Sequence, residues 1–340
     1  MKGDRQPTRA RQDCAGVALV VVMWVVLVLS LLISGFAFTM HVETRVASYA
    51  RKRQHAEALA RSGVELARRE LILDVMTATN STYDARNQPW ATNEWYVNHA
   101  LGDGVLNVVV TDEESKIPVN RASPEQLRRL MILMEVDEGE IDIIVDSVVD
   151  WMDENDLHQL NGAEDEYYLS LEPPYRAKNA ALDRIEELLM VRGVTPELFY
   201  GLPATAEEEA VPGLVEFLTA TSAGRINVNT AAPLVLQALL GLDDLQLEAV
   251  LNRRDGGDGE WGTEDDQPFQ SLGEFFPVVA GLTQEVQNQL QSVLTVNSEY
   301  FTVRATGDVG HVKRTIVAVL HRHGAQVTIV GWRETAGESG

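Results

Sequence analysis

Acidic side chains crowd one short segment of the chain, around an Asn-Gly step at residues 161 and 162. Carboxylate oxygens spaced along a glycine-containing turn suit Ca²⁺, which takes about six to eight oxygen ligands in loose geometry. Without a cation, carboxylates this close together repel one another and raise one another's pKa. The spacing does not match an EF-hand, so the residues alone leave a calcium site and a solvated acidic loop both open. The candidate ligands are Asp150, Asp153, Asp156, Glu164 and Asp165, with Glu166 beside them.

Other residues that could do chemistry give weaker signals. His321 and His323 could share one face of a strand, but at that spacing a solvated pair is commoner than a metal site. A second acidic, glycine-rich segment, residues 253–266 with Asp255, Asp258, Asp265 and Asp266, is a weaker calcium candidate and is interpreted by default as a flexible loop. The sequence has no G-x-S-x-G, H-E-x-x-H or P-loop motif, and its single cysteine is Cys14. We therefore predict no catalytic residues and no enzyme activity.

An apolar run extends from Ala15 to Met40 without one Asp, Glu, Lys or Arg. A helix of that length is able to cross a hydrocarbon core of about 30 Å. Apolar positions at helical spacing predict that the helix continues beyond the run, through Leu71. By the positive-inside rule, the basic residues before the run place that end in the cytoplasm, and the basic residues after it weaken the bias. The first group is Lys2, Arg5, Arg9 and Arg11, and the second is Arg45, Arg51, Lys52 and Arg53.

A short basic leader that ends in Gly16, followed at once by an apolar helix from Val17, resembles type IV prepilins and type II secretion pseudopilins. The resemblance implies that a membrane peptidase cuts between Gly16 and Val17 and that the new N-terminus is methylated. Most members of these families have Glu at the fifth mature position, where this chain has Val21. In this respect the chain is similar to the K-type minor pseudopilins, which are placed at the filament tip. On the leader and helix alone, a plain single-pass anchor is the alternative.

Length and charge limit the remaining possibilities. At 340 residues the chain is long enough for two or three domains besides the helix. Its formal net charge is −23, from 51 acidic and 28 basic residues. Such a surface repels phosphate backbones, so nucleic acid is a poor candidate partner, and cations and basic protein surfaces are better ones.

Two segments of the chain repeat one another. KIPVNRASPEQLRRLM, from Lys116, aligns with RINVNTAAPLVLQALL, from Arg225, and two later helix starts align around Gly193 and Gly281. Each copy reads as a strand end, an Asn, a helix started by Pro, and short helices joined by Gly. The copies resemble helix-hairpin-helix modules, so a membrane-tethered DNA receptor for DNA uptake is the alternative function. The acidity of both copies argues against it.

The D-W-M-D, N-G-A-E-D-E-Y-Y-L and P-P-Y-R elements of residues 150–178 closely resemble the K-type minor pseudopilins, and the resemblance extends from Gly16 to about Trp332. It implies Ca²⁺ in the helical domain, which favours the calcium site over the solvated loop. It also implies a non-enzymatic protein at the tip of the type II secretion pseudopilus, which nucleates assembly for protein export across the outer membrane. The implied partners are the I- and J-type minor pseudopilins, the major pseudopilin, the prepilin peptidase and the inner-membrane secretion platform.

Strand patterns complete the expected fold. Residues 105–112 and 299–332 alternate and are rich in β-branched side chains, with turn signals at Gly307, Gly310 and Gly324. We predict an α+β fold. An N-terminal transmembrane or spike helix packs on a small antiparallel, pilin-like sheet, and two helix-hairpin-helix or SAM-like modules form an inserted helical domain.

The expected segments follow the chain in order. They are a cytoplasmic prepilin leader (1–16), the transmembrane and spike helix (17–75), the first part of the sheet (76–115), a first helical module with the acidic loop (116–213), a second helical module (214–297) and the return strands (298–334). We expect a single-pass protein of the bacterial inner membrane, with the leader cytoplasmic and the bulk periplasmic.

Overall fold

The computed structural model describes residues 14–77, 83–92, 96–205, 209–260 and 262–336. The chain divides into two compact units, Met1–His55 and Ala56–Gly340. Most of the expected leader, residues 1–13, lies outside the described residues.

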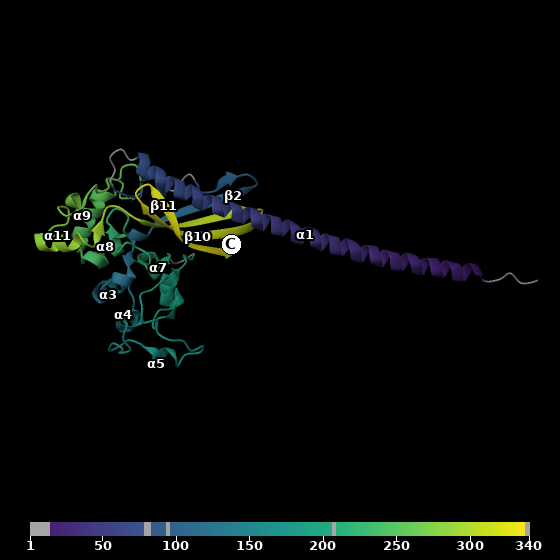
Figure 1. Ribbon diagram of the computed structural model, residues 1–340, viewed down its shortest axis with the longest axis horizontal. Coiled ribbons are helices and arrows are strands. Elements are labelled where there is room, and N and C mark those ends of the chain that lie inside the picture. Colours follow the sequence, from purple (N-terminus) through teal and green to yellow (C-terminus); the bar gives the residue numbers. More distant parts are fainter. Residues whose placement is uncertain (1–13, 78–82, 93–95, 206–208, 261, 337–340) are drawn as a thin grey trace, which may run out of the picture. The chain divides into compact units, whose positions relative to one another are not determined.

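The first unit contains the N-terminal part of one long helix, α1 (Cys14–Thr77) (Figure 1). The apolar side chains of residues 18–47 are exposed. An 18-residue window of this helix has a mean hydropathy of 2.8, and α1 is the one helix in the described residues that is long and apolar enough to cross a membrane. The hydroxyls of Thr39 and Thr44 donate to the carbonyl oxygens of Gly35 and Met40 one turn earlier. These polar groups are therefore satisfied within the helix. The predicted long apolar helix is confirmed.

Strands from two distant parts of the chain form one antiparallel sheet. Residue 108 lies opposite residue 305 in the next strand, and residue 305 lies opposite residue 316 in the third. Alternate side chains along each strand point to the same face, so one face of the sheet is apolar. In sheet order the five strands are β1 (His99–Leu101), β2 (Gly104–Asp112), β9 (Tyr300–Val309), β10 (Val312–His323) and β11 (Gln326–Ala336).

The C-terminal part of α1 packs on this apolar face. Ala60, Val64, Ala67 and Leu71 recur every three or four residues, form one stripe and are buried in the same core as the strands. A Cβ at Gly63 would lie 2.9 Å from each of three strand side chains, so glycine lets the helix approach the sheet closely. The predicted packing of the helix on a small antiparallel sheet is confirmed.

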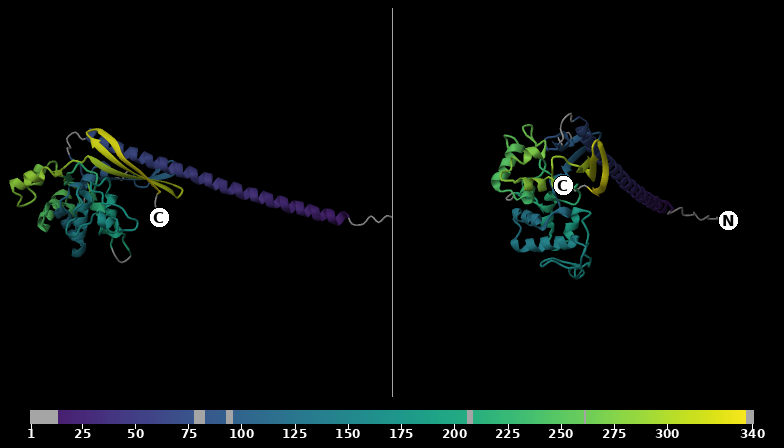
Figure 2. Two further views of the ribbon diagram at one scale, coloured as in Figure 1. Left: turned by 60° about the horizontal axis from the view of Figure 1, so that its bottom comes forward. Right: turned by 60° about the vertical axis from the view of Figure 1, so that its left-hand side comes forward.

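Between β2 and β9 the chain leaves the sheet and forms helices, which Figures 1 and 2 show grouped beside it. The first part begins after η2 (Glu113–Ser115) and ends at a short strand that pairs in parallel with its own first strand. Its elements are β3 (Ile117–Pro118), η3 (Val119–Arg121), α3 (Pro124–Leu133), α4 (Glu138–Met152), α5 (Asp165–Tyr168), η4 (Ile185–Met190), α6 (Pro196–Tyr200), β4 (Gly201–Leu202), β5 (Val211–Pro212), α7 (Leu214–Phe217) and β6 (Leu218–Thr219).

The second part repeats this closure, because its first and last strands also pair in parallel. Its elements are β7 (Ile226–Asn227), α8 (Pro233–Leu240), α9 (Asp244–Arg254), α10 (Leu272–Phe275), α11 (Gln284–Leu290) and β8 (Leu294–Thr295). A separate short helix, α2 (Pro89–Thr92), precedes the first strand of the sheet in the chain. The equivalent helices α3 and α8 contact each other, and both parts contribute to one hydrophobic core. Residues 218 and 219, expected in the second module, pair with the first strand of the first.

Local sequence signals start these helices. Ser123 caps α3 in a capping box with Gln126, and Asp243 does the same for α9 with Gln246. Thr195 caps α6 by accepting from a backbone N–H three residues later, as Thr283 does for α11.

Candidate functional site

The acidic loop between α4 and α5 is held in place by two carboxylates of α4. Asp150 is fully buried, and both of its oxygens accept from the backbone N–H of Gln159 at 3.0 Å. Oδ2 of Asp146 accepts from the backbone and side-chain nitrogens of Asn161 at 3.0 and 3.1 Å. A Cβ at Gly162 would lie 1.8 Å from Oδ2 of Asp150, so the loop can pass this carboxylate only with glycine there.

Glu164 is the candidate ligand with the clearest need for a cation. Its side chain is only 5% exposed, and neither carboxylate oxygen has a hydrogen-bond partner among the described residues. Burial, followed by the negative charges of Asp150, Asp153, Asp156 and Asp165, raises its pKa to about 7. A desolvated carboxylate among like charges would be stabilised by a bound cation.

The other candidate ligands already have partners. Asp153 accepts from the backbone and side-chain nitrogens of Asn155, and Asp156 accepts from Nδ2 of Asn179 at 3.0 Å. Asp165 pairs with the guanidinium of the P-P-Y-R element and accepts from the backbone N–H of the next residue, Ala177. Throughout the part of the chain that the structure describes, no three His, Cys, Asp or Glu side chains are grouped closely enough to hold a metal ion. The donor chemistry of the loop fits Ca²⁺, and calcium binding stays a prediction.

The aromatic residues of the same motif support the loop. Trp151 and Tyr168 pack edge to face at 5.2 Å, and Tyr175 stacks on Tyr168 at 5.3 Å. The guanidinium of Arg192 lies 4.9 Å over the ring of Tyr167 and donates to the carbonyl oxygen of Gly162 at 3.0 Å. The conspicuous Trp and Tyr residues therefore build a packed base beneath the acidic segment.

The helix hairpins are poorly suited to DNA. Gly193 and Gly281 adopt left-handed conformations, with φ of +86° and +84°, as joints between short helices. The helices that follow carry Glu197 and Glu285 in their first turns, where a DNA phosphate would otherwise meet free backbone N–H groups. These carboxylates would repel a phosphate.

The remaining sequence candidates do not form a metal centre. The ring of His321 stacks on Tyr300 at 4.5 Å, and its Nε2 lies 3.7 Å from Glu299. In the second acidic loop, Asp265 accepts from the backbone N–H of Gly257 at 2.8 Å, which ties that loop to itself.

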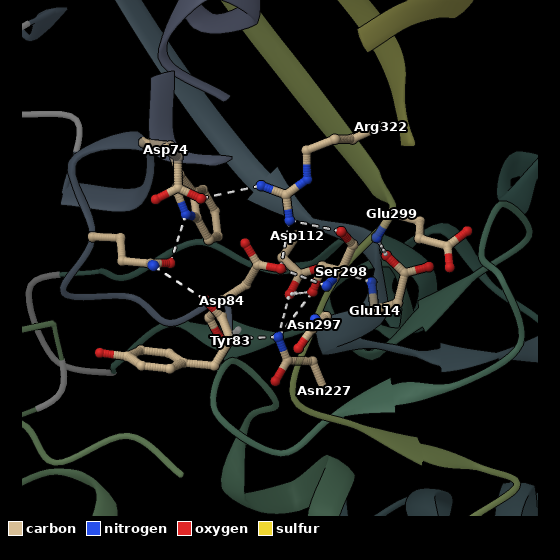
Figure 3. A network of polar contacts seen from close by, with 12 residues as sticks. Asp74, Tyr83, Asp84, Asp112, Glu114, Asn227, Asn297, Ser298, Glu299 and Arg322 are labelled. Carbon is tan, nitrogen blue, oxygen red and sulfur yellow. Dashed lines mark hydrogen bonds and ion pairs between the residues drawn. The ribbon is translucent and has the colours of Figure 1, made fainter. Parts of the chain in front are cut away.

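A buried polar junction that the sequence did not predict joins the sheet to the second helical part and to the segment that links the two parts (Figure 3). Asp112, at the end of β2, accepts from the hydroxyls of Thr230 and Ser298. Glu114, two residues later, accepts from the backbone N–H groups of Ala223 at 2.9 Å and Tyr300 at 2.9 Å. Burial and then the charge of Glu114 raise the pKa of Asp112 to about 8. Asp112 and Glu114 thus hold segments more than 100 positions away.

Arg322 of β10 is the cation of this junction. Its guanidinium donates to Asp84 at 2.5 Å, to Asp74 at 3.2 Å and to the carbonyl oxygen of Ser298 at 2.8 Å (Figure 3). It is 6% exposed and lies 4.7 Å from the ring centroid of Phe301. Burial and then the charge of Asp84 raise the pKa of Asp74 to about 6.

The repeated sequence contains a signal for part of this junction. Asn120 donates to and accepts from the backbone of Leu182, and Asn229 makes the same pair of bonds to Phe269. L-T-A-T-S, from residue 218, and L-T-V-N-S, from residue 294, also match, and the Thr hydroxyl of each bonds to the backbone two residues later. Aligning these closing strands would have revealed where each repeat ends.

Residues 104–204 and residues 226–303 each match the family described as Type II secretion system (T2SS), protein K. The matched segments together make up just over half of the chain. The chain belongs to this family.

Known proteins are similar to this chain over most of its length. It is 27% identical over 327 residues to the type II secretion system protein K of Pseudomonas aeruginosa, covering 92% of this chain and 90% of that protein. It is 25% identical to the protein of the same name from Aeromonas hydrophila, covering 93% and 95%. A chain of the crystal structure of the GspK-GspI-GspJ complex from enterotoxigenic Escherichia coli has a similar fold, with a TM-score of 0.67, 22% identity and coverage of 86% of this chain and 99% of that one.

Membership of the protein K family confirms the predicted minor pseudopilin role in type II secretion. The alternative of a DNA-uptake receptor is not supported.

Proposed function

We propose that this protein K forms the tip of the type II secretion pseudopilus and nucleates its assembly with I- and J-type minor pseudopilins. The crystal structure of similar fold is a complex of GspK with GspI and GspJ, which supports this set of partners. The observation that carries the proposal is the helical domain inserted between β2 and β9, which adds bulk to a pilin-like sheet. Such bulk would block the addition of a further subunit above it. The role is structural and not enzymatic.

The type of the helical modules, the orientation in the membrane and the remaining partners are part of the same proposal. We assign the two helical parts to helix-hairpin-helix or SAM-like modules, on their repeated order of strand, Pro-started helix and Gly-joined short helices. We place the leader in the cytoplasm and the bulk in the periplasm, with α1 in the inner membrane. The further partners are the major pseudopilin, the prepilin peptidase and the inner-membrane secretion platform.

Processing at Gly16 tests the proposal. Gly16 and Val17 lie in the first turn of α1, and we expect the mature, methylated N-terminus at Val17. A retained leader pins the helix in the bilayer, because moving Lys or Arg through hydrocarbon costs at least about 2.5 kcal/mol each. Gly16 must fit the peptidase beside the scissile bond, so Gly16→Leu should abolish cleavage. The retained leader should then abolish co-purification with I- and J-type pseudopilins, and secretion.

N-terminal mass spectrometry of the membrane-extracted protein and affinity purification measure these outcomes. Gly35→Leu is the matched control, because Gly35 lies in the same helix and, apart from the adjacent helix backbone, an added Cβ would have nothing within 4 Å. A native N-terminus at Met1, or one beyond Met40, would contradict the proposal.

Val21 tests the tip position. A Glu at the fifth mature position is thought to pair with the N-terminal ammonium of a neighbouring subunit, and a subunit at the tip would not need that pair. Val21→Glu should therefore leave secretion unchanged, whereas Val25→Asp should impair membrane insertion by about 3 kcal/mol. An increase in secretion with Val21→Glu, in a quantitative assay of exported protein, would argue against the tip position.

We also propose that the acidic loop binds Ca²⁺ through Asp150, Asp153, Asp156, Glu164 and Asp165. The buried, unpartnered carboxylate of Glu164 supports this site most directly. A bound cation would tie the loop between α4 and α5 to the helical domain and offset the repulsion among its carboxylates.

A further inference from the structure

Four basic side chains on α1 follow the apolar run, and neither the tip role nor the calcium site uses them. We propose that this basic segment, Arg45, Arg51, Lys52 and Arg53, binds anionic phospholipid headgroups of the leaflet on the side of the membrane that holds the bulk of the chain. The inference rests on the proposed insertion of α1 in the membrane.

The basic segment is available for an external partner. All four side chains are exposed, and within the described residues none of them makes a hydrogen bond or an ion pair. By contrast, Arg61, about two turns beyond Arg53 on the same helix, pairs with Glu57 and Glu334 at 2.8 and 2.9 Å. Four cations thus remain unpaired in a chain that has 51 acidic residues.

The position of the basic segment relative to the apolar run favours lipid. At about 1.5 Å per residue, Arg45 lies about 8 Å beyond Met40 and Arg53 about 20 Å beyond it. The headgroup region adds about 5–7 Å on each side of the hydrocarbon core. The attraction of an anionic leaflet extends about one further Debye length, roughly 8 Å. Long Lys and Arg side chains can reach back toward the membrane, so all four lie within range.

The distribution of charge also favours lipid binding over a basic segment that is merely exposed to solvent. Arg45 and Lys52 are seven residues apart and share one helix face with His41, whereas Glu43 lies on the opposite face. The chain as a whole has a net charge of −23, so most of its surface repels anionic headgroups. Once the basic leader has been cleaved, this segment is the basic group nearest to the apolar run. It would hold the mature helix at the membrane through a reversible, salt-sensitive contact until assembly.

Headgroup proximity in vesicles tests the inference on the full-length chain. Gln54→Cys, combined with Cys14→Ser, provides one site for a fluorophore beside the basic segment. The labelled chain is reconstituted into phosphatidylcholine vesicles, with or without about 30% phosphatidylglycerol, each with a trace of lipid that carries a headgroup nitroxide. We expect about twofold stronger quenching in the anionic vesicles at low salt, and no difference at about 0.5 M salt.

Substitutions separate the basic segment from general charge effects. Arg51→Gln, Lys52→Gln and Arg53→Gln together, which keep only Arg45 of the segment, should remove most of the difference between the two kinds of vesicle. The matched control removes three exposed basic side chains of the second unit, with Arg69→Gln, Arg304→Gln and Lys313→Gln, and should keep the difference.

Equal quenching in the two kinds of vesicle, with the chain floating with both, would overturn lipid binding while leaving insertion intact. Quenching that does not depend on the lipid, together with cross-linking of residue 54 to an acidic pseudopilin, would assign the segment to a protein and also overturn the inference. A chain that floats with neither vesicle would instead contradict the membrane insertion on which the inference rests.

Discussion

Replacing Arg322 by methionine should destabilise a soluble fragment that begins at Arg45 by about 3–5 kcal/mol, because the change leaves buried carboxylates without their cation. Asp84 is 3% exposed and shares the guanidinium with Asp74 and a backbone carbonyl. Methionine keeps much of the side-chain volume, so the loss reports charge and hydrogen bonding more than an empty cavity. Urea unfolding, followed by circular dichroism, measures the difference in unfolding free energy.

An exposed ion pair provides the matched control. Arg128 donates to Asp142 at 2.7 Å, with side-chain exposures of 34% and 54%. Arg128→Met should cost less than about 1 kcal/mol, because water screens the pair. Arg322→Lys keeps the charge with fewer fixed donors, so its loss of unfolding free energy should fall between those of Arg322→Met and Arg128→Met. A loss below about 1 kcal/mol for Arg322→Met would show that the junction contributes little to stability.

The pH dependence of this effect has a definite sign. The pKa of Asp74 is raised to about 6 and that of Asp112 to about 8, each first of all by burial. A raised folded-state pKa contributes stability that is fully present below the unfolded value of 3.8 and is lost as the pH rises through the folded value. The guanidinium of Arg322 lowers the pKa of Asp74, so its removal should steepen the decline. Arg322→Met should therefore cost more at pH 8 than at pH 4.

Much of the fold could be predicted from local patterns. Apolar alternation predicted β2, β9, β10 and β11, and the run without charges predicted the long α1. Pro124 and Pro233 do begin equivalent helices, as the repeat indicated. These predictions succeeded because their signals are local in the sequence. Strand alternation and helix capping depend on residues a few positions apart, and a membrane helix is one uninterrupted apolar run.

The polar junction escaped prediction because its contacts join distant positions through single side chains. Asp112 meets Ser298, which lies 186 residues later, and nothing near Asp112 distinguishes it from a surface carboxylate. The closing strands β3, β6, β7 and β8 have two residues each, too few to show an alternating pattern. At the acidic loop, the sequence grouped Asp165 with the other carboxylates, yet Arg176 of the P-P-Y-R element pairs with it. Composition showed the charges but could not show which of them already had partners.

Calcium should raise the melting temperature of the fragment that begins at Arg45 by about 5–10 °C relative to the chelated protein. A ligand that binds only the folded state stabilises it by RT ln(1 + [L]/Kd), which is about 2.7 kcal/mol at a hundredfold excess over Kd. Mg²⁺ should help less, because it prefers octahedral sites and retains its water. Thermal melts in millimolar Ca²⁺, Mg²⁺ or chelator, at constant ionic strength, make the comparison.

Substitutions in the loop decide which carboxylates bind the ion. Glu164→Gln should remove most of the calcium response while leaving the chelated protein no less stable, because it deletes an unpartnered buried charge among like charges. Glu166→Gln, at an exposed neighbour, is the matched control and should keep the response.

Asp165 distinguishes the full predicted ligand set from a smaller one. If Asp165 leaves Arg176 to bind the ion, Asp153→Asn with Asp165→Asn should abolish the response. If Asp165 keeps its guanidinium partner, Asp165→Asn alone should lower stability equally with and without calcium, because the change then removes only the ion pair. The size of the calcium shift in that single variant therefore separates a ligand from a residue that orders the loop. Equal melting temperatures of the unsubstituted fragment in calcium and chelator would identify the whole segment as a solvated acidic surface.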